Sequence, residues 1–277
     1  MKRKGVWYDE NKDIIMEKYH NNERVEDIAI ELQCSRYMLY QKFTEWNISR
    51  RNKIKAKPRS NAIYTINYEY FKKIDTEHKA YWYGFLLADG YVNERELSLC
   101  VKNTDIDIIQ IFAEDIETDV PIKYDKYGNP FITIVCKELS KSLLDKGFHN
   151  RKSWSIDFDY IKSFVPDELF NHFIRGMFDG DGCLKYYSYP YLKKPQLHFG
   201  YTGVKNVCEF IKDFFDINRD LIFEGNVTYT VVSRDPNKII EICTYLYNNS
   251  TIYLKRKYEI YNKIKMMTFN DYNKAVS

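Results

Sequence analysis

The strongest constraint on the fold is a seven-residue pattern that occurs twice. Gly84–Gly90 reads GFLLADG and Gly176–Gly182 reads GMFDGDG, 92 residues later. The match continues downstream, where Thr104 corresponds to Thr202 and residues 134–137 correspond to residues 231–234. The offset grows to 97–98 in these later matches, as expected if the second copy has a longer first hairpin around residues 186–196. A duplication of this length indicates two halves with the same fold.

Hydrophobic periodicity gives each copy the same order of elements: helix, two alternating strands, helix, two strands, helix. This order predicts an α+β protein built as a pseudo-two-fold αββαββα duplication with two antiparallel sheets. We expect the first half to span residues 63–150 and the second half residues 151–277.

The repeated pattern is also typical of two helices that pack closely. Gly84 with Ala88, and Gly176 with Gly180, place small residues at positions i and i+4 of one helix face. Small residues on one face allow two helix backbones to approach each other. A glycine at the end of each copy then stops the helix.

Each of these helices is predicted to end on an acid, Asp89 in the first copy and Asp181 in the second. Negative charge is unfavourable at a helix C-terminus, and pairing the helices brings the two carboxylates towards each other. The alternative is that each Asp-Gly pair is only a hairpin turn. Because the same unfavourable choice occurs twice in matched positions, we favour a functional role in which divalent cations compensate the charge.

Positive charge is concentrated near the N-terminus. Residues 1–60 carry 14 Lys and Arg against 9 Asp and Glu, whereas the remainder carries 28 against 30. Residues 49–62 contain no acid and are predicted to be a basic linker, since Pro58 and Ser60 disfavour a helix there. A basic run of this kind is either a solvated linker or an arm that contacts phosphates. The arm residues predicted to bind DNA are Arg50, Arg51, Lys53 and Lys55.

Residues 1–48 are predicted to be a small all-α domain. Between residues 9 and 48, three apolar stripes have helical spacing: Ile14, Ile15 and Tyr19, then Ile28, Ala29 and Leu32, and then Leu39, Phe43 and Trp46. Ser35 is placed to cap the third helix after a short turn. This is helix-turn-helix spacing, and residues 25–48 resemble the helix-turn-helix of resolvase-like and homeodomain-like proteins. The alternative is a three-helix bundle that binds protein or merely packs. The residues predicted to face DNA from the third helix are Arg36, Tyr37, Tyr40 and Gln41.

Several other classes of protein are disfavoured. No apolar run approaches 18 residues and no apolar segment follows the basic start, so we expect neither a membrane span nor a secretory signal, and a cytoplasmic location. The six cysteines are at least 25 residues apart, which disfavours a zinc or redox Cys-x-x-Cys pair.

The duplicated pattern resembles the LAGLIDADG homing endonucleases in their single-chain, two-motif form. The resemblance covers about residues 63–265 and rests on the glycines, the small residue, the terminal acid and the strand order. It implies two saddle-shaped sheets that lie in the major groove of double-stranded DNA, and a chain that acts as a monomer. Two departures are Leu87, where the family has an earlier acid, and Gly203, where it often has a polar residue such as Asp105.

The resemblance also implies the chemistry. Asp89 and Asp181 would bind the catalytic metal, for which Mg²⁺ is expected, and Lys137 and Arg234 would be the basic residues of the two active sites. The expected activity is site-specific hydrolysis of one phosphodiester on each DNA strand. Two alternatives stay open: a transcriptional regulator that combines this scaffold with a helix-turn-helix but does not cut DNA, and a maturase that binds intron RNA.

Overall fold

The structure is a computed structural model, and it describes residues 5–20, 25–46, 48, 64–148, 156–189, 191 and 195–276. The chain folds as two compact units, Met1–Lys57 and Pro58–Ser277. The first unit corresponds to the predicted N-terminal domain and part of the linker. The second contains both halves of the predicted duplication. No helix in the described ranges is long and apolar enough to cross a membrane.

The N-terminal unit is a helical bundle with its own core. Its helices are α1 (Gly5–Glu10), α2 (Lys12–His20), α3 (Val25–Glu31) and α4 (Arg36–Glu45). The sequence predicts three helices, and the structure adds α1. The core residues are Tyr8, Ile15, Tyr19, Val25, Ile28, Ala29, Leu39 and Phe43. All but Tyr8 and Val25 lie on or beside the predicted stripes, whereas Ile14, also assigned to a stripe, is 48% exposed.

The turn between α3 and α4 has the predicted capping. Ser35 Oγ accepts a hydrogen bond from the Met38 amide at 3.4 Å, and the Ser35 amide donates to the Tyr8 hydroxyl at 2.9 Å. These bonds satisfy an amide of the first turn of α4 and attach the turn to α1. The turn between α3 and α4 is therefore held both by its cap on α4 and by its bond to α1.

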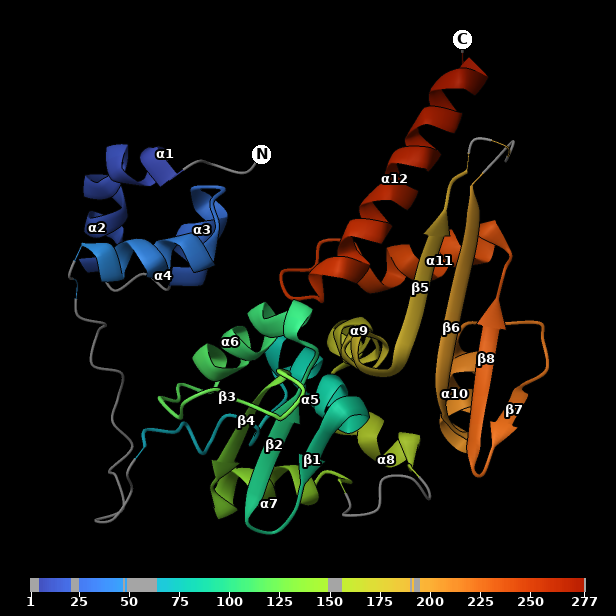
Figure 1. The fold of residues 1–277 in the computed structure, drawn as a ribbon, viewed down its shortest axis with the longest axis horizontal. Coiled ribbons are helices and arrows are strands. Elements are labelled where there is room, and N and C mark those ends of the chain that lie inside the picture. Colours follow the sequence, from blue (N-terminus) through green and yellow to red (C-terminus); the bar gives the residue numbers. More distant parts are fainter. Residues whose placement is uncertain are drawn as a thin grey trace. The chain divides into compact units, whose positions relative to one another are not determined.

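The second unit consists of two similar halves (Figure 1). The first half contains α5 (Glu77–Asp89), β1 (Gly90–Val92), β2 (Glu96–Cys100), the short 3-10 turn η1 (Asn103–Asp105), α6 (Ile106–Asp115), β3 (Lys123–Tyr124), β4 (Pro130–Val135) and α7 (Lys137–Leu144). A connection with α8 (Phe158–Lys162) and η2 (Asp167–Leu169) leads to the second half. The second half contains α9 (Phe170–Asp181), β5 (Gly182–Tyr187), β6 (Gln196–Val204), α10 (Lys205–Phe214), β7 (Ile222–Gly225), β8 (Thr228–Ser233), α11 (Pro236–Tyr247) and α12 (Lys255–Val276).

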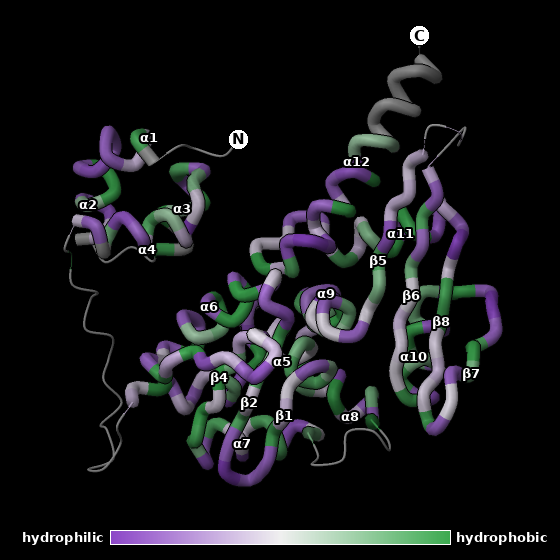
Figure 2. Tube along the Cα trace, in the orientation of Figure 1, coloured by the Kyte–Doolittle hydropathy of each residue, from purple (hydrophilic) through white to green (hydrophobic). Residues whose placement is uncertain are grey.

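The two sheets have the same topology. Their strand orders are β1-β2-β4-β3 and β5-β6-β8-β7, and all neighbours are antiparallel. The second sheet has the longer first hairpin, as the growing offset of the repeat predicts. Hydrophobic and hydrophilic residues both occur along β6 (Figure 2), where Leu197, Phe199 and Tyr201 are buried on one face. Gln196, His198 and Thr202, on the other face, are exposed or half-buried, so one face of the sheet packs against helices while the other remains open. The α+β duplication is therefore confirmed.

The halves meet along α5 and α9, which lie side by side at the centre of the unit (Figure 1). A Cβ built on Gly84 would lie 2.0 Å from the carbonyl oxygen of Phe173, and one on Gly180 would lie 2.5 Å from Cβ of Ala88. The helices therefore approach too closely for any side chain at these glycines. This confirms the role that the sequence predicts for the small residues.

The terminal glycines act differently from the prediction. Gly90 and Gly182 end α5 and α9 in extended conformations, with φ of −78° and −80°, rather than in the left-handed conformation of a helix C′ glycine. A Cβ on Gly182 would lie 2.1 Å from the ring of Phe178, and one on Gly90 would lie 2.7 Å from Leu86. Lack of space, not a positive φ, requires glycine here, and each strand starts directly at the helix end.

Candidate functional site at the paired helix ends

The two repeated acids end two helices that are packed against each other. Asp89 is the last residue of α5 and Asp181 the last residue of α9, and both are exposed. The Cβ position of Gly180, directly before Asp181, lies 3.5 Å from the amide nitrogen of Asp89. The helices thus remain in close contact up to the ends that carry their terminal carboxylates. Two exposed carboxylates beside the negative ends of two helix dipoles form a strongly negative site.

Tyr201 lies beneath this site in β6. Its ring is buried, and its hydroxyl lies 3.5 Å from Oδ2 of Asp181, at the limit of a hydrogen bond. Burial, and then the negative charge of Asp181 with a smaller contribution from Asp89, raise the pKa of this phenol well above its ordinary value. Both carboxylates therefore act on one phenol, which remains a protonated donor beside the site.

A lysine that was not predicted as a site residue contacts the last turn of α9, the turn that ends at Asp181. Lys257, in the first turn of α12, is 1% exposed and donates to the carbonyl oxygens of Phe178 and, at 3.0 Å, Asp179. Both carbonyls belong to the last turn of α9, and that of Phe178 also accepts from the amide of Gly182, which caps the helix. Burial lowers the pKa of Lys257 to about 8, whereas the negative charges of Asp179 and Asp89 oppose that decrease.

The sequence contains a signal for Lys257. The core side of α12 follows Leu254, Lys257, Tyr261 and Ile264, spaced by three, four and three residues, and all four are buried. A lysine on the apolar face of an amphipathic helix must find partners inside the protein, because an unpaired buried charge is costly. That placement distinguishes Lys257 from the surface lysines of the chain.

The strand register separates Lys137 from the acids. Gly90, next to Asp89, pairs with Leu99, which pairs with Ile132 of β4. From Ile132, β4 continues for three more residues to Val135, and Lys137 follows as the first residue of α7. At a rise of about 3.3 Å per residue, the end of β4 is already roughly 10 Å from the level of Gly90. Along the strands, Lys137 therefore lies beyond the level of the helix end that carries Asp89.

Arg234 is separated from Asp181 in the same way. Gly182 pairs with Tyr201, which pairs with Val231, and Arg234 lies three residues further along the chain, roughly 10 Å away. It lines a hollow of about 520 Å³ on the open face of the second sheet. The hollow is lined by Cys183, His198, Gly200, Thr202, Arg219, Ile222, Glu224, Thr230, Val232 and Arg234. Arg234 therefore belongs to a surface that can contact a ligand, and the strand register places both basic residues further along their strands than the helix ends.

Asp105 has a structural partner. It is 7% exposed, and its Oδ2 accepts from Nε of Arg256 at 3.0 Å, in an ion pair that joins the first half to α12. The residue at the position where the family often has a polar side chain is thus buried against an arginine. Gly203 lies in β6, where an added Cβ would make only an ordinary contact with Tyr201 at 3.4 Å.

The donor set at the helix ends suits a hard divalent cation. Carboxylate oxygens are the ligands that Mg²⁺ and Ca²⁺ prefer, and Mg²⁺ keeps several of its waters when one or two carboxylates bind it. In the described ranges, no cluster of three or more His, Cys, Asp or Glu side chains could hold a metal alone. A cation between Asp89 and Asp181 would therefore complete its shell with water or with substrate oxygens.

The N-terminal unit presents a second polar surface, along α4. Tyr37 is 47% exposed and Gln41 is exposed, and Nε2 of Gln41 donates to the Tyr37 hydroxyl at 2.8 Å. Arg36 is half-buried. Tyr40 is also half-buried and packs edge-on against Phe43, with ring centroids 6.3 Å apart, so it faces the core more than predicted. The predicted arm residues Arg50, Arg51, Lys53 and Lys55 lie outside the described residues.

The fold is similar to those of several solved DNA-bound proteins. The LAGLIDADG meganuclease I-AabMI, bound to uncleaved DNA, is 11% identical over 70% of this chain and 92% of its own, with a TM-score of 0.51. The LAGLIDADG homing endonuclease I-GzeII, in complex with its DNA target, is 13% identical over 69% and 91%, also at 0.51. The meganuclease I-SmaMI, bound to uncleavable DNA, is 14% identical over 71% and 90%, with a TM-score of 0.50.

By sequence, no family model and no curated protein matches the chain. The structural likeness, at this low identity, nevertheless shows the fold of the LAGLIDADG homing endonucleases, as the sequence resemblance predicts.

Proposed function

We propose that this chain is a site-specific endonuclease that hydrolyses one phosphodiester on each strand of double-stranded DNA with a divalent metal ion. The observation that carries the proposal is the pairing of two exposed carboxylates, Asp89 and Asp181, at the abutting ends of α5 and α9. One carboxylate per half on a pseudo-two-fold axis is suited to two cuts, one on each antiparallel strand. The likeness to endonucleases bound to DNA supports the same substrate.

In this proposal Asp89 and Asp181 hold Mg²⁺. When bound, the ion supplies activation of a water and neutralisation of charge on the phosphate oxygens. Lys257 adds positive charge from the protein side and keeps the last turn of α9 in place through its bonds to Phe178 and Asp179. Lys257 thus takes the role that the resemblance assigned to Arg234 in the second half.

The open faces of the two sheets are proposed to read the DNA. Arg234 and Arg219 line the hollow of the second sheet with His198, and burial followed by the charges of Lys185, Arg234 and Arg219 lowers the pKa of His198. Such a concentration of positive charge attracts phosphates and guanine edges in the major groove. Exposed Lys123 and Lys126 give the first sheet positive charge as well.

The N-terminal unit is proposed to bind DNA outside the cleavage site. The capped α3–turn–α4 segment and the paired side chains of Tyr37 and Gln41 support this role. Base-reading residues of a helix-turn-helix lie near the start of its second helix, where Arg36 and Tyr37 are found. The basic residues 50–59 would add phosphate contacts that are independent of sequence.

The test compares cleavage and binding of one substrate, DNA carrying the chain's own insertion locus without the insert. Wild type with Mg²⁺ is expected to linearise a plasmid with this site, whereas Asp89→Asn and Asp181→Asn are expected to bind it normally without cutting. Asp213→Asn is a matched control, because Asp213 is also an exposed acid in the last turn of a helix, α10. If wild type binds but never cuts, the transcriptional regulator becomes the better interpretation.

A further inference from the structure

Asp179 is a buried carboxylate whose two oxygens are held by three different segments. Its Oδ1 accepts from the Tyr247 hydroxyl at 2.6 Å, and its Oδ2 accepts from the Tyr81 hydroxyl at 2.9 Å and the Leu254 amide at 2.7 Å. The residue is fully buried in α9, two positions before Asp181. Because each bond comes from a donor and the site is buried, these hydrogen bonds hold the carboxylate in one position.

The bond to Leu254 connects Asp179 to the lysine of the candidate site. Leu254 directly precedes α12, and its carbonyl accepts from the amides of Lys257 and Tyr258, which form the first turn of that helix. The side chain of Lys257 then returns to α9, where it donates to the carbonyl oxygen of Asp179. Asp179 therefore holds the start of the turn that carries Lys257, and also receives the end of that side chain.

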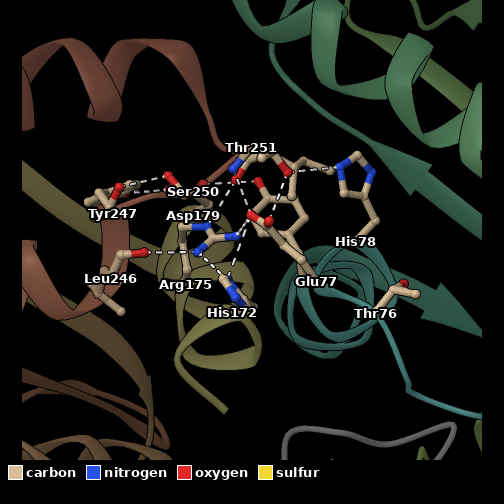
Figure 3. Close-up of polar contacts among 12 residues, drawn as sticks. Thr76, Glu77, His78, His172, Arg175, Asp179, Leu246, Tyr247, Ser250 and Thr251 are labelled. Atoms are coloured by element: carbon tan, nitrogen blue, oxygen red, sulfur yellow. Dashed lines mark hydrogen bonds and ion pairs between the residues drawn. The ribbon is translucent and has the colours of Figure 1, made fainter. Parts of the chain in front are cut away.

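The loop before α12 has a second group of anchors, further from Lys257 (Figure 3). Arg175, one turn earlier on α9, donates from Nε to the carbonyl of Ile252 and from Nη1 to that of Leu246, both at 2.9 Å. Glu77 of α5 accepts from the amide and the hydroxyl of Thr251 and from Arg175. These bonds fix residues 246–252, and Asp179 fixes the last peptide before the helix.

The first half lacks this carboxylate. Leu87 occupies the position of Asp179 in the first copy of the repeat and is buried among apolar residues. A leucine side chain cannot accept a hydrogen bond, so no bond equivalent to Asp179–Leu254 can form there. The two halves, although duplicated, therefore differ in how the chain near the metal site is held.

We propose that Asp179 is a positioning residue that places Lys257 for cleavage of one DNA strand, through its hydrogen bond to the Leu254 amide, and that cleavage of the other strand does not depend on it. The inference rests on the proposed endonuclease function and on the role of Lys257 in it. Displacement of a charged group by about 1 Å can reduce a rate by about 100-fold.

The test uses Asp179→Leu, which copies Leu87 of the first half, and Asp179→Asn, which keeps an oxygen for the Leu254 amide. Supercoiled plasmid with the target site is cut by excess enzyme with Mg²⁺, and nicked and linear products are followed over time. We expect Asp179→Leu to slow one strand about 10- to 100-fold more than the other, so that nicked circles accumulate. Asp179→Asn should cut the affected strand at close to the wild-type rate, because its side-chain oxygen can still accept from the Leu254 amide.

Two further variants separate positioning from general loss of stability. Tyr247→Phe removes one hydrogen bond from the same carboxylate but leaves the Leu254 bond, so it should not change the ratio of the two strand rates. Lys257→Met should slow the same strand as Asp179→Leu, and the double variant should be no slower than Lys257→Met alone. Binding of each variant is measured with Ca²⁺ in place of Mg²⁺, and folding by thermal unfolding.

Each outcome bears on the inference. Three results would overturn it: Asp179→Leu slows cleavage of both strands equally, Asp179→Asn and Asp179→Leu slow cleavage equally, or the double variant cuts more slowly than Lys257→Met alone. Lys257→Met cutting both strands at the wild-type rate would overturn it too. Failure of wild type to cut, by contrast, rejects the proposed function itself.

Discussion

The carbonyl oxygen of Tyr81 lies 2.0 Å from where a Cβ on Gly176 would be, so α5 and α9 touch backbone to backbone. The same relationship occurs in reverse between Gly84 and the carbonyl of Phe173. Because both obstacles are backbone atoms, no rotation of a side chain could make room. The contact fixes the separation of the helix ends that carry Asp89 and Asp181.

Gly176→Ala should therefore separate the halves. Overpacking a close contact costs about 1–3 kcal/mol or more, and here the helices must move apart. We expect a clearly lower melting temperature together with loss of cleavage. Gly203→Ala is the control, since its Cβ would meet nothing closer than 3.4 Å, and it should stay within about 1 kcal/mol of wild type. Wild-type stability in Gly176→Ala would contradict the close packing.

Lys137 and Arg234 should contribute to affinity and not to chemistry, since both lie roughly 10 Å or more along the strands from the acids. Lys137→Ala and Arg234→Ala are expected to weaken binding, with the salt slope reduced by up to about one unit if a phosphate contact is lost. At saturating enzyme, single-turnover cleavage should remain near the wild-type rate. A large loss of that rate in either variant would restore its catalytic assignment.

His172 should make the protein less stable in acid. Its Nδ1 lies 2.7 Å from Nη1 of Arg175, which can only donate, so the ring must be neutral to accept. Burial and the neighbouring guanidinium lower the pKa of His172 from 6.5 to about 4. The unfolded chain therefore binds this proton at a higher pH than the folded chain, and stability is lost as the pH falls from about 6.5 towards 4.

The measurement is thermal unfolding across that pH range for wild type and His172→Asn. The asparagine can accept from Arg175 but does not titrate, so its melting temperature should fall less than that of wild type. If the melting temperatures of the two proteins fall equally with pH, His172 does not contribute to the loss of stability in acid.

The N-terminal unit should act on binding alone. Removing residues 1–60 is expected to weaken affinity and spare the chemistry, because both acids and Lys257 lie downstream. Six phosphate contacts from the basic run would contribute roughly five units of log–log salt slope at most. Replacement of four residues by alanine should instead weaken the sequence preference for one flank of the DNA site, with little change in the salt slope of binding: Arg36, Tyr37, Tyr40 and Gln41. Unchanged affinity, slope and flank preference after truncation would indicate a protein partner for this unit.

One chain should suffice for one DNA site, because the duplication supplies both halves of the pseudo-two-fold axis. Light scattering of the DNA complex should give the mass of one protein chain plus DNA. Two chains per site would contradict the idea that each chain provides a complete pair of carboxylates.

The amino-acid sequence determined the features that depend on local order and on the repeat. The duplicated Gly84 and Gly176 patterns predict both the paired helices and the two similar sheets, since small residues, alternation and the terminal acids are visible in the chain itself. The cap at Ser35 and the stripes of α2–α4 follow from the same local rules.

Only the tertiary structure shows which basic residue contacts the last turn of α9. Lys137 and Arg234 occupy matched places in the repeat, but antiparallel pairing carries the ends of β4 and β8 away from Gly90 and Gly182. Lys257 reaches α9 from the far end of the chain, because burial of the apolar face of α12 turns its first turn inward. The bond between Lys257 and Asp179 joins residues 78 positions apart, and such contacts follow from how the elements pack, which no local pattern in the sequence specifies.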